Sequence, residues 1–385
     1  MSIPSKKFEE MDITDKQIAL HVPTLVGGGA ERVMINLANE YAKRGLNVEM
    51  VLYRKEGEHL SELVPEVRCI GLEGKKAPVY SAMGSLVPLR GYLNERNPDI
   101  FLSGLTRANA VAILARATTN VDTRLIVTEH NHLASTVAGA DLRRLQMLPI
   151  IARVTYPFAD EILAVSNGVA DSLANVSGLP RESIQTIYNP VVTDELRQKA
   201  QEPCDHPWLT SEDGPPVILG AGSLTPQKNF QMLIKAFEKV QQLTEARLVI
   251  ISEGELRDQL ERQIDRLGLD DYVDLPGFVD NPYSYMNAAD VFALSSKWEG
   301  LPTVLIEAMA CGTPVVSTDC PSGPSEILQD GKYGPLVSVD DTDGFANALI
   351  DTLHSPPQKE KLQQRADDFS VEKVADEYLD LFFNR

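Results

Sequence analysis

Along most of the chain, short apolar runs typical of strands alternate with segments in which apolar residues recur every three or four positions, as on one face of a helix. A short apolar run at 18–23 is followed by three glycines at 27–29. The residues that then form one face of a helix are Ala30, Val33, Met34, Leu37, Ala38 and Tyr41. Gly45 ends this predicted helix, and 48–53 reads as a second strand. Strand, glycine loop, helix and strand form a β-α-β unit.

This alternation continues, breaks once and then restarts. Further strands are predicted at 100–102, 125–128 and 161–166. Residues 195–216 are polar and rich in proline, which predicts a linker. The elements predicted after it are strands at 217–221, 248–251, 291–294 and 315–317, and helices around 230–237, 256–267, 302–310, 345–353 and 371–383.

The pattern predicts an α/β protein with two Rossmann-like, doubly wound parallel-sheet domains facing a cleft. A chain of 385 residues is long enough for two cores. The expected bounds are a first domain at 1–193, a linker at 194–216, a second domain at 217–368, and a C-terminal helix at 369–385 that crosses back to the first domain. Ligands of such sheets bind at the carboxyl ends of the strands.

The charge of the chain is strongly negative and unevenly distributed. The net charge is −19, from 36 basic and 55 acidic residues. Residues 1–190 carry almost none of it, so the excess lies in the second half. Such a field repels nucleic-acid phosphates, and we expect no nucleic-acid partner. A small anionic ligand would need a locally positive site or backbone N–H groups.

Other features of composition indicate a cytoplasmic protein. No apolar run reaches 18 residues, so no transmembrane helix is expected. Residues 1–16 lack the apolar stretch of a secretory signal. The four cysteines fall in no metal-binding spacing, which favours a reducing compartment.

The most informative motif is at 296–318, Ser-Lys-Trp-Glu-Gly-Leu-Pro-Thr-Val-Leu-Ile-Glu-Ala-Met-Ala-Cys-Gly-Thr-Pro-Val-Val-Ser-Thr. Glu299 lies in a loop after a strand, and Glu307 lies in a helix whose first turn accommodates Pro302. The free N–H groups of that turn and the helix dipole favour an anion. A pyrophosphate fits there, with Glu307 reaching a ribose hydroxyl and Glu299 a sugar hydroxyl.

Two other loops join a predicted strand to a predicted helix. In Gly222-Ser-Leu-Thr-Pro-Gln-Lys-Asn-Phe, Lys228 can neutralise phosphate, although an ordinary exposed lysine is the alternative. The loop at 27–31 lets backbone approach a ligand closely, although a tight turn without a ligand is the alternative. It is not a dinucleotide fingerprint, because Arg32 stands where the third glycine should be.

A histidine also follows a predicted strand. The segment reads Thr-Glu-His-Asn-His at 128–132, which places His130 where it can bond a transferred sugar or support an acceptor. A satisfied loop residue is the alternative. No third metal ligand is apparent, so no zinc site is expected. The acidic pair Asp341 and Asp343 resembles a metal-binding motif but is interpreted as the start of a helix.

Together these stretches resemble the retaining family 4 glycosyltransferases of group 1 type, which have the GT-B fold. The resemblance covers roughly residues 18–383. The blocks that carry it follow the family's order and are Gly28-Gly-Ala-Glu-Arg32, Ala164-Val-Ser-Asn-Gly168, Ile187-Tyr-Asn-Pro190, Gln227-Lys-Asn-Phe230, Gly277-Phe-Val279, and the pair Glu299 and Glu307.

The resemblance implies roles for particular residues. It implies catalytic roles for His130, Lys228 and Glu299. The residues it implies around the donor are Gly28, Gly29, Asn189, Ser223, Lys228, Glu253, Phe278, Val279, Glu299, Gly300, Leu301, Pro302, Thr303 and Glu307. Those it implies near the acceptor are Glu31, Arg32 and His132. One departure is Ser223, which stands where many members have an arginine beside the diphosphate.

The implied activity is that of a hexosyltransferase without a metal or other cofactor. The first domain would lie on the acceptor side, and the second would bind a nucleotide-diphosphate sugar, by resemblance a UDP-sugar. The transferred group would be a hexose or N-acetylhexosamine, and the acceptor a glycan or lipid-linked molecule of surface polysaccharide or glycolipid assembly. The basic and apolar stretch at 142–153 is interpreted as a helix packed on the first sheet, with peripheral membrane contact as the alternative.

Three other functions compete with this one. A dinucleotide oxidoreductase is disfavoured by the missing third glycine and by the paired glutamates. A nucleotide-sugar epimerase of the same fold and a non-catalytic sugar-nucleotide-binding protein remain alternatives.

Overall fold

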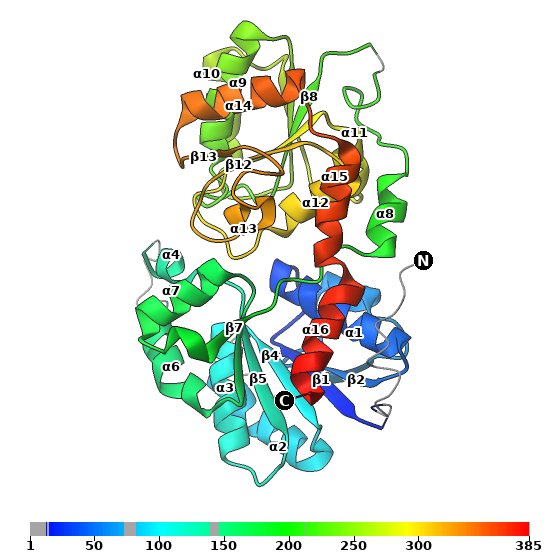
Figure 1. Ribbon diagram of the computed structural model, residues 1–385, viewed down its shortest axis with the longest axis vertical. Coiled ribbons are helices and arrows are strands. Elements are labelled where there is room, and N and C mark those ends of the chain that lie inside the picture. The colour runs from blue at the N-terminus through cyan, green and yellow to red at the C-terminus, as the bar shows by residue number, and fades with distance from the viewer. Residues whose placement is uncertain (1–12, 14, 73–81, 139–145, 212, 385) are drawn as a thin grey trace. The chain divides into compact units, whose positions relative to one another are not determined.

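The chain folds into two compact units. The structure, a computed structural model, describes residues 13, 15–72, 82–138, 146–211 and 213–384. The first unit comprises Met1–Val165, Val169–Pro190 and Val374–Arg385, and the second comprises Ser166–Gly168 and Val191–Lys373. Each unit contains one parallel sheet covered by helices (Figure 1).

The first unit is built on a seven-stranded parallel sheet with the order β3-β2-β1-β4-β5-β6-β7. Its strands are β1 (Gln17–Val22), β2 (Asn47–Leu52), β3 (Arg68–Gly71), β4 (Ile100–Gly104), β5 (Arg124–Glu129), β6 (Glu161–Ala164) and β7 (Ile184–Thr186). The strand order reverses between β1 and β4, which pair directly. Ligands of doubly wound sheets bind at the carboxyl side of such a switch point.

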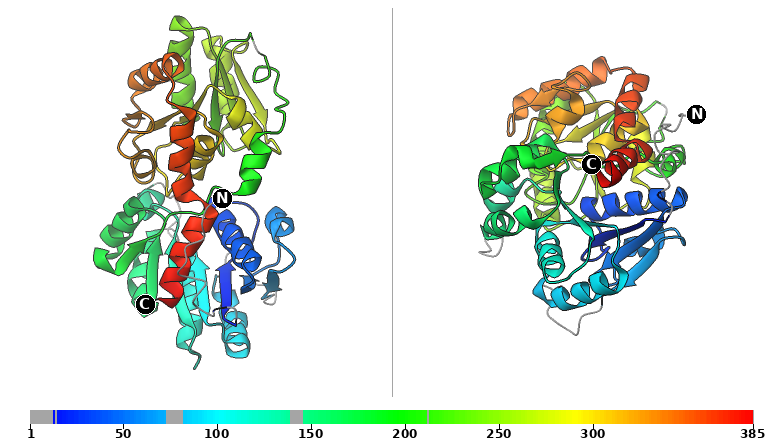
Figure 2. Two further views of the ribbon diagram at one scale, coloured as in Figure 1. Left: turned by 45° about the vertical axis from the view of Figure 1, so that its right-hand side comes forward. Right: turned by 60° about the horizontal axis from the view of Figure 1, so that its bottom comes forward.

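The helices of the first unit cover both faces of that sheet. They are α1 (Gly29–Lys43), α2 (Leu86–Arg96), α3 (Thr106–Ala117), α4 (Leu133–Ala138), α6 (Leu148–Thr155), α7 (Asn167–Ser177) and most of α16 (Val371–Phe383), with the 3-10 helices η1 (Glu58–Glu62), η2 (Ala82–Ser85), η3 (Tyr156–Phe158) and η4 (Arg181–Ser183). The predicted apolar face of α1 is buried beside α16, where the rings of Tyr41 and Phe382 lie 6.2 Å apart (Figure 2).

The second unit is built on a six-stranded parallel sheet with the order β10-β9-β8-β11-β12-β13. Its strands are β8 (Val217–Ala221), β9 (Arg247–Ile251), β10 (Val273–Gly277), β11 (Val291–Leu294), β12 (Val315–Thr318) and β13 (Leu336–Val337). Here the switch point lies between β8 and β11, which pair directly.

The helices of the second unit include α12, which lies within the motif at 296–318. They are α8 (Asp194–Ala200), α9 (Phe230–Leu243), α10 (Arg257–Leu267), α11 (Pro282–Ala288), α12 (Thr303–Cys311), α13 (Pro324–Leu328), α14 (Thr342–His354) and α15 (Lys359–Ala366), with the 3-10 helix η5 (Asp367–Phe369). Sequence periodicity predicts α10, α12 and α14 to within a few residues. It predicts the start of α9, which extends beyond the expected 230–237 to Leu243. Gly268 ends α10 in the left-handed conformation.

Residues 194–216 differ from the expected linker. They belong to the second unit and begin with α8, whose Leu196 and Ala200 are buried. Thr193 caps this helix by accepting a hydrogen bond from the Leu196 amide. The prolines after the helix mark irregular chain that is nevertheless part of a folded body.

The predicted C-terminal helix is present as α16. Its residues from Val374 onward belong to the first unit, so the chain returns there after the second unit. No helix in the described part of the chain is long and apolar enough to span a membrane. Of the stretch at 142–153, only 146–153 lies within the described residues, and so do only 13, 15 and 16 of the first sixteen.

Candidate active site

The functional residues predicted in the second unit follow the carboxyl ends of its strands. Lys228 lies in the loop after β8, and Glu253 and Phe278 follow β9 and β10. Glu299 lies in the loop between β11 and α12. One edge of the sheet, spanning its switch point, therefore carries all four loops.

Lys228 and Glu299 form an ion pair at this edge. The Nζ atom of Lys228 lies 2.6 Å from Oε1 of Glu299, and both side chains are largely buried. The aliphatic part of the lysine passes over Gly222, where a Cβ would lie 3.1 Å from Cε of Lys228. Gly222 has φ +141°, so a side chain there would be strained as well as crowded.

The two carboxylate oxygens of Glu299 have different surroundings. Oε1 accepts from Lys228 and from the Ser296 hydroxyl, which is 2.7 Å away. Oε2 has one long contact among the described residues, 3.4 Å from Nε2 of Gln227. A carboxylate has about four lone-pair sites, so Oε2 retains capacity for a ligand hydroxyl.

The loops that carry Lys228 and Glu299 are joined by hydrogen bonds. The Lys297 amide donates to the Gln227 carbonyl at 2.8 Å, and Nε2 of Gln227 donates to the Trp298 carbonyl at 2.9 Å. The Ser295 hydroxyl donates to the Lys228 carbonyl at 2.7 Å. This bonding holds the lysine and the glutamate in place before any ligand arrives, which lowers the ordering cost of binding.

The loop after β8 is also locked to the loop after β9. The Leu224 amide donates to the Glu253 carbonyl at 2.9 Å, and the backbone of Leu224 leaves no room for a side chain at Gly254. Ser223 therefore sits between two anchored segments, although its hydroxyl supplies no positive charge. Lys228 is the cation of this loop.

Glu253 and Phe278 lie on the outer part of the same edge. Glu253 is exposed and pairs with Arg257, whose Nη1 lies 2.9 Å from Oε1 of the glutamate. Phe278 is 71% exposed, and Val279 is half-buried. The Gly277 carbonyl accepts from the Ser252 amide at 2.7 Å, which fixes the chain just before Phe278. An exposed aromatic ring and nearby backbone can accommodate a base.

The amino end of α12 is free of side-chain caps. The helix begins at Thr303, with Pro302 at the N-cap position and no side-chain hydrogen bond to the first turn. This places Pro302 one residue before the predicted first turn, a difference within the usual uncertainty of helix ends. Uncapped N–H groups together with the helix dipole suit an anion.

Close packing holds the turn before α12. A Cβ on Gly323 would lie 2.4 Å from Cδ of Pro302, so only glycine fits against this proline. The Ser322 hydroxyl donates to the Gly300 carbonyl at 2.6 Å. The neighbouring Leu301 is buried. The 300–303 turn is therefore rigid, as an anion site made of backbone amides requires.

Glu307 lies one turn further along α12. It is half-buried, at helical spacing from Thr303, so the two residues share one side of the helix. Burial of the Cys311 thiol is the larger cause, and the charge of Glu307 the smaller, of a rise in the pKa of that thiol to about 12. Ribose binding by Glu307 stays a prediction.

His130 follows β5 in the first unit and is not a satisfied loop residue. Neither ring nitrogen, both buried, has a hydrogen-bond partner among the described residues. Burial lowers the pKa of this imidazole to about 4, so it is neutral at physiological pH. An unpartnered buried polar group is costly, which is typical of a residue retained for function.

Glu129, beside His130, is a buried carboxyl that the sequence alone did not single out. The Thr106 hydroxyl lies 2.9 and 2.8 Å from its two oxygens, and the Tyr156 hydroxyl donates at 3.0 Å. Asn109 in turn donates to the Tyr156 hydroxyl. Burial raises the pKa of Glu129 to about 7. This network joins the end of β5 to α3 and thereby supports the backbone of His130.

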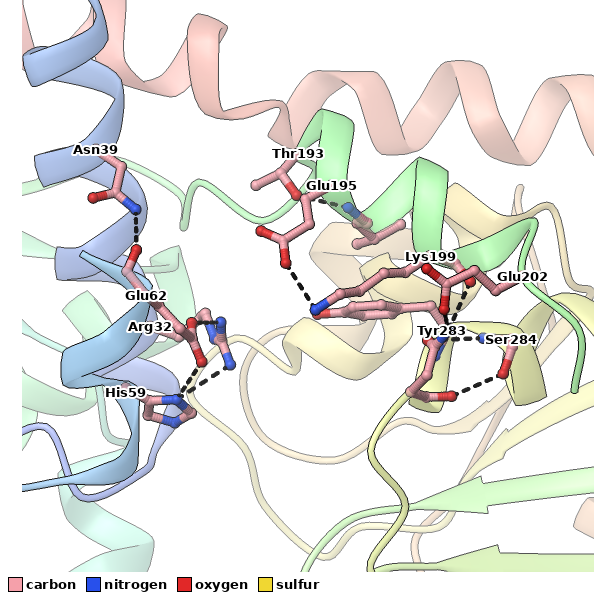
Figure 3. A network of polar contacts seen from close by, with 12 residues as sticks. Arg32, Asn39, His59, Glu62, Thr193, Glu195, Lys199, Glu202, Tyr283 and Ser284 are labelled. Atoms are coloured by element: carbon pink, nitrogen blue, oxygen red, sulfur yellow. Dashed lines mark hydrogen bonds and ion pairs between the residues drawn. The ribbon is translucent and has the colours of Figure 1, made fainter. Parts of the chain in front are cut away.

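The glycine loop of the first unit lies against η1. The Leu25 carbonyl leaves no space for a side chain at Gly57, and a Cβ on Gly27 would lie 3.6 Å from Nε2 of His59. Figure 3 shows that Arg32 and His59 both reach Glu62, which lies 2.7 Å from Nδ1 of His59. Arg32 is therefore part of a charged cluster beside the loop.

Five other predicted residues occupy varied surroundings in the first unit. The Glu31 carboxylate lies over Gly28, and burial raises the pKa of Glu31. Gly29 opens α1 with space around it. His132 accepts from the Ser135 amide at the start of α4, as a helix cap does. The buried side-chain oxygen of Asn189 has no hydrogen-bond partner among the described residues.

The acidic pair near residue 341 is a helix start, as predicted. Asp341 caps α14 by accepting from the Gly344 amide at 2.9 Å. Among the described residues, no group of three or more His, Cys, Asp or Glu side chains is placed to hold a metal ion. Metal independence stays a prediction for this site.

Models of two protein families match separate parts of the chain. The family described as glycosyl transferases group 1 matches residues 205–369, which include Lys228, Glu299 and Glu307. The family described as glycosyltransferase family 4 matches residues 27–195, which include the glycine loop and His130.

Similar proteins extend over nearly the whole chain. A Campylobacter jejuni N-acetylgalactosamine-N,N'-diacetylbacillosaminyl-diphospho-undecaprenol 4-alpha-N-acetylgalactosaminyltransferase is 30% identical over 370 residues, which cover 94% of this chain and 97% of that protein. The lipopolysaccharide core biosynthesis glycosyltransferase LpsE of Rhizobium meliloti is 27% identical over 93% of this chain and 96% of its own.

Solved structures share the fold. Anabaena HepE in complex with UDP-glucose superposes with a TM-score of 0.75 at 21% identity, covering 96% of this chain and 100% of that one. The two parallel-sheet units, together with the likeness to HepE and to other solved glycosyltransferase structures, establish the GT-B fold. By its sequence matches and its fold, the chain belongs to the family 4 glycosyltransferases of group 1.

Proposed function

We propose that the chain is a retaining glycosyltransferase that moves a hexose or N-acetylhexosamine from a UDP-sugar to a lipid-linked saccharide. The Lys228–Glu299 ion pair, at the same sheet edge as the uncapped start of α12, carries this proposal. A cation and free backbone amides suit a diphosphate, and a carboxylate oxygen with spare capacity suits a sugar hydroxyl.

The substrates are inferred from similar proteins. The Campylobacter jejuni relative is named for transfer of N-acetylgalactosamine to a diphospho-undecaprenol-linked acceptor, and HepE was solved with UDP-glucose. We therefore favour UDP-N-acetylgalactosamine as the first donor to test and an undecaprenyl-diphosphate-linked saccharide as the first acceptor. Such chemistry belongs to surface polysaccharide or glycolipid assembly on the cytoplasmic side of a membrane.

The proposed reaction proceeds on one face of the sugar. The bond from the anomeric carbon to the leaving diphosphate oxygen breaks, and the bond from that carbon to the acceptor oxygen forms on the same side. The acceptor proton passes to the leaving diphosphate. In this proposal Glu299 is not a nucleophile: its Oε1 atom accepts from Lys228 and Ser296, and its Oε2 atom binds a sugar hydroxyl. Catalysis then consists of positioning and electrostatic stabilisation.

Each residue of the second unit has a part in this proposal. Lys228 and the amides of the turn at 300–303 neutralise the diphosphate as its charge grows. Glu299 orients the sugar, Glu307 binds the ribose, and the exposed segment at Phe278 receives the base. His130 is proposed as a substrate-contacting group of the first unit, because both of its ring nitrogens are free to bond.

The test is a transfer assay with product analysis. We expect UDP-N-acetylgalactosamine and the lipid-linked acceptor to give a product with an α linkage, detected by the anomeric proton coupling in NMR, and equally in the presence of EDTA. A β-linked product would overturn retention, and loss of activity with EDTA would overturn metal independence. A changed nucleotide sugar formed without acceptor would show an epimerase, and donor binding without any turnover would show a binding protein.

A further inference from the structure

Helix α6 of the first unit is apolar on two opposite sides. Its inner side carries Leu148 and Ala152, and Tyr156 continues that side into η3; all three are buried. This side packs toward α3, a helix of the same unit. The inner residues already account for the packing of the helix, so the other side needs a separate explanation.

The outer side of α6 and η3 exposes four large apolar residues. Their exposed fractions are 49% for Met147, 53% for Ile150, 61% for Val154 and 65% for Phe158. Spacings of three, four and four residues place them along one stripe, about 16 Å long at the helical rise. We call these four residues the α6 face. By contrast, α10 of the second unit exposes charged residues such as Arg262 and Asp265.

The charge around the α6 face is opposite to that of the chain. The segments α3, α6 and η3 contain Arg107, Arg116 and Arg153 and no acidic residue, whereas the whole chain has a net charge of −19. Arg153 is exposed next to Val154, and α3 adds the partly exposed Leu114. Arg116 pairs with Asp160, so the exposed Arg153 is a cation that lies directly beside the apolar stripe.

We propose that the α6 face inserts into the surface of an anionic lipid bilayer. Exposed apolar side chains beside Arg153, with the nearby Asp160 carboxylate paired to Arg116, match the interface between acyl chains and acidic headgroups. A stripe of four side chains is small for a stable protein–protein interface, which needs about 800 Å² per partner. The inference goes beyond the proposed function and agrees with its lipid-linked acceptor, because docking would hold the enzyme where that acceptor resides.

Vesicle sedimentation with matched variants tests this docking. The probes are vesicles of phosphatidylcholine alone and of phosphatidylcholine with phosphatidylglycerol, and the variant is the double substitution Ile150→Ser and Val154→Ser. The control is Leu243→Ser, because Leu243 is 73% exposed on α9 of the second unit. We expect the full-length protein to sediment with the anionic vesicles, the double variant to bind about tenfold less, and the control to bind normally.

Several results would overturn the inference. The double variant could bind anionic vesicles as well as the unaltered protein, or the Leu243→Ser control could lose as much binding as the double variant. The unaltered protein could also bind only the neutral vesicles, or bind no vesicles at all. A concentration-dependent dimer in ultracentrifugation that the double variant abolishes would show instead that a second copy covers the face. Unchanged melting temperatures would show that both variants fold.

A second readout separates this inference from the proposed transferase activity. With a detergent-soluble short-chain acceptor, the double variant should transfer sugar at the normal rate. With the acceptor embedded in anionic vesicles, it should be about tenfold slower. Equal rates on both acceptors would contradict the docking role. Absence of transfer by the unaltered protein would contradict the proposed function and leave vesicle binding as the measure of the α6 face.

Discussion

Lys228 donates to Glu299 with 2.6 Å between Nζ and Oε1, across 71 residues of sequence. The two residues come from loops after β8 and β11, the strands that meet at the switch point of the second sheet. Each loop reads as a ligand-binding segment by itself. Their pairing makes one site in which the cation and the carboxylate hold each other in place until a substrate arrives.

Replacement of Lys228 by alanine should slow transfer on the order of ten- to thousandfold. The lost ammonium would stabilise the leaving diphosphate most strongly in the transition state. It would also leave the Glu299 carboxylate without its ion-pair partner, so a thermal melt must accompany the kinetic assay. Lys239→Ala is the matched control, because Lys239 pairs with Asp343 on an exposed surface. An active Lys228→Ala enzyme would remove this lysine from the diphosphate site.

Replacement of Ser296 by alanine should raise the donor KM by roughly fivefold. The Ser296 hydroxyl donates to Oε1 of Glu299, and loss of one such bond costs about 1 kcal/mol. Glu299→Gln should have a larger effect, since it removes the charge that pairs with Lys228 as well. Steady-state kinetics over a range of donor concentrations measures both. If the serine variant were as impaired as Glu299→Gln, Ser296 would do more than orient the glutamate.

Replacement of His130 by leucine should abolish most transfer without lowering stability. Leucine fills a similar volume and removes two buried nitrogens that have no partner among the described residues, a defect that costs about 1–3 kcal/mol. The melting temperature should therefore stay level or rise while kcat falls. A melting temperature that drops together with the activity would indicate a structural histidine.

The pH profile of transfer should show no acid limb from His130 near pH 6.5. Burial lowers the pKa of this histidine to about 4, so the ring stays neutral down to about pH 5. A bell-shaped profile whose limb near pH 6.5 disappears in His130→Leu would contradict this assignment. Residual activity of the variant, measured with excess enzyme, is sufficient for the comparison.

Glu129 should make stability decrease as pH rises. Its pKa is about 7 in the folded protein and about 4.5 when unfolded, so the folded state binds the proton more tightly. The stabilisation is complete below pH 4.5 and is lost as pH rises through 7, by up to about 3 kcal/mol. Glu129→Gln mimics the protonated form. The melting temperature of this variant minus that of the unaltered protein should therefore increase from pH 5 to pH 8.

The comparison with Glu129→Gln is needed because two buried histidines of the same unit give stability the opposite dependence on pH. Burial lowers the pKa of both His21 and His130 to about 4, so their contributions to stability are lost as pH falls from 6.5 toward 4. Both histidines are present in the unaltered protein and in Glu129→Gln, so their contributions cancel when one melting temperature is subtracted from the other. A difference that does not change with pH would show that Glu129 stays ionised in the folded state.

The sequence predicts the alternation of strands and helices well but misses its weakest parts. Strands β8 and β11 are continuous apolar runs and are predicted with the observed bounds. Strands β3, β7 and β10 are missed because they mix polar with apolar positions, and β13 is missed because it is only two residues long. Their identity as strands depends on pairing with a neighbour, as Val273 pairs with Leu248, which local pattern does not contain.

The candidate site divides in the same way. Motifs predict the residues of the second unit, because glycine, proline and charged side chains occur there at fixed offsets from a strand. The carboxyl of Glu129 gives no such signal, because its buried partners come from elsewhere in the fold, Thr106 earlier in the sequence and Tyr156 later. The stretch at 142–153 allows two interpretations from sequence, membrane contact or packing on the first sheet, and only the fold shows which side of α6 is covered.

The position of bound UDP in a crystal structure of this protein tests the account most directly. We predict that the diphosphate lies at the first turn of α12, within hydrogen-bond reach of the Thr303 amide and of Nζ of Lys228, with the ribose beside Glu307. A diphosphate bound away from that turn, or one that leaves Lys228 paired only with Glu299, would contradict the central claim.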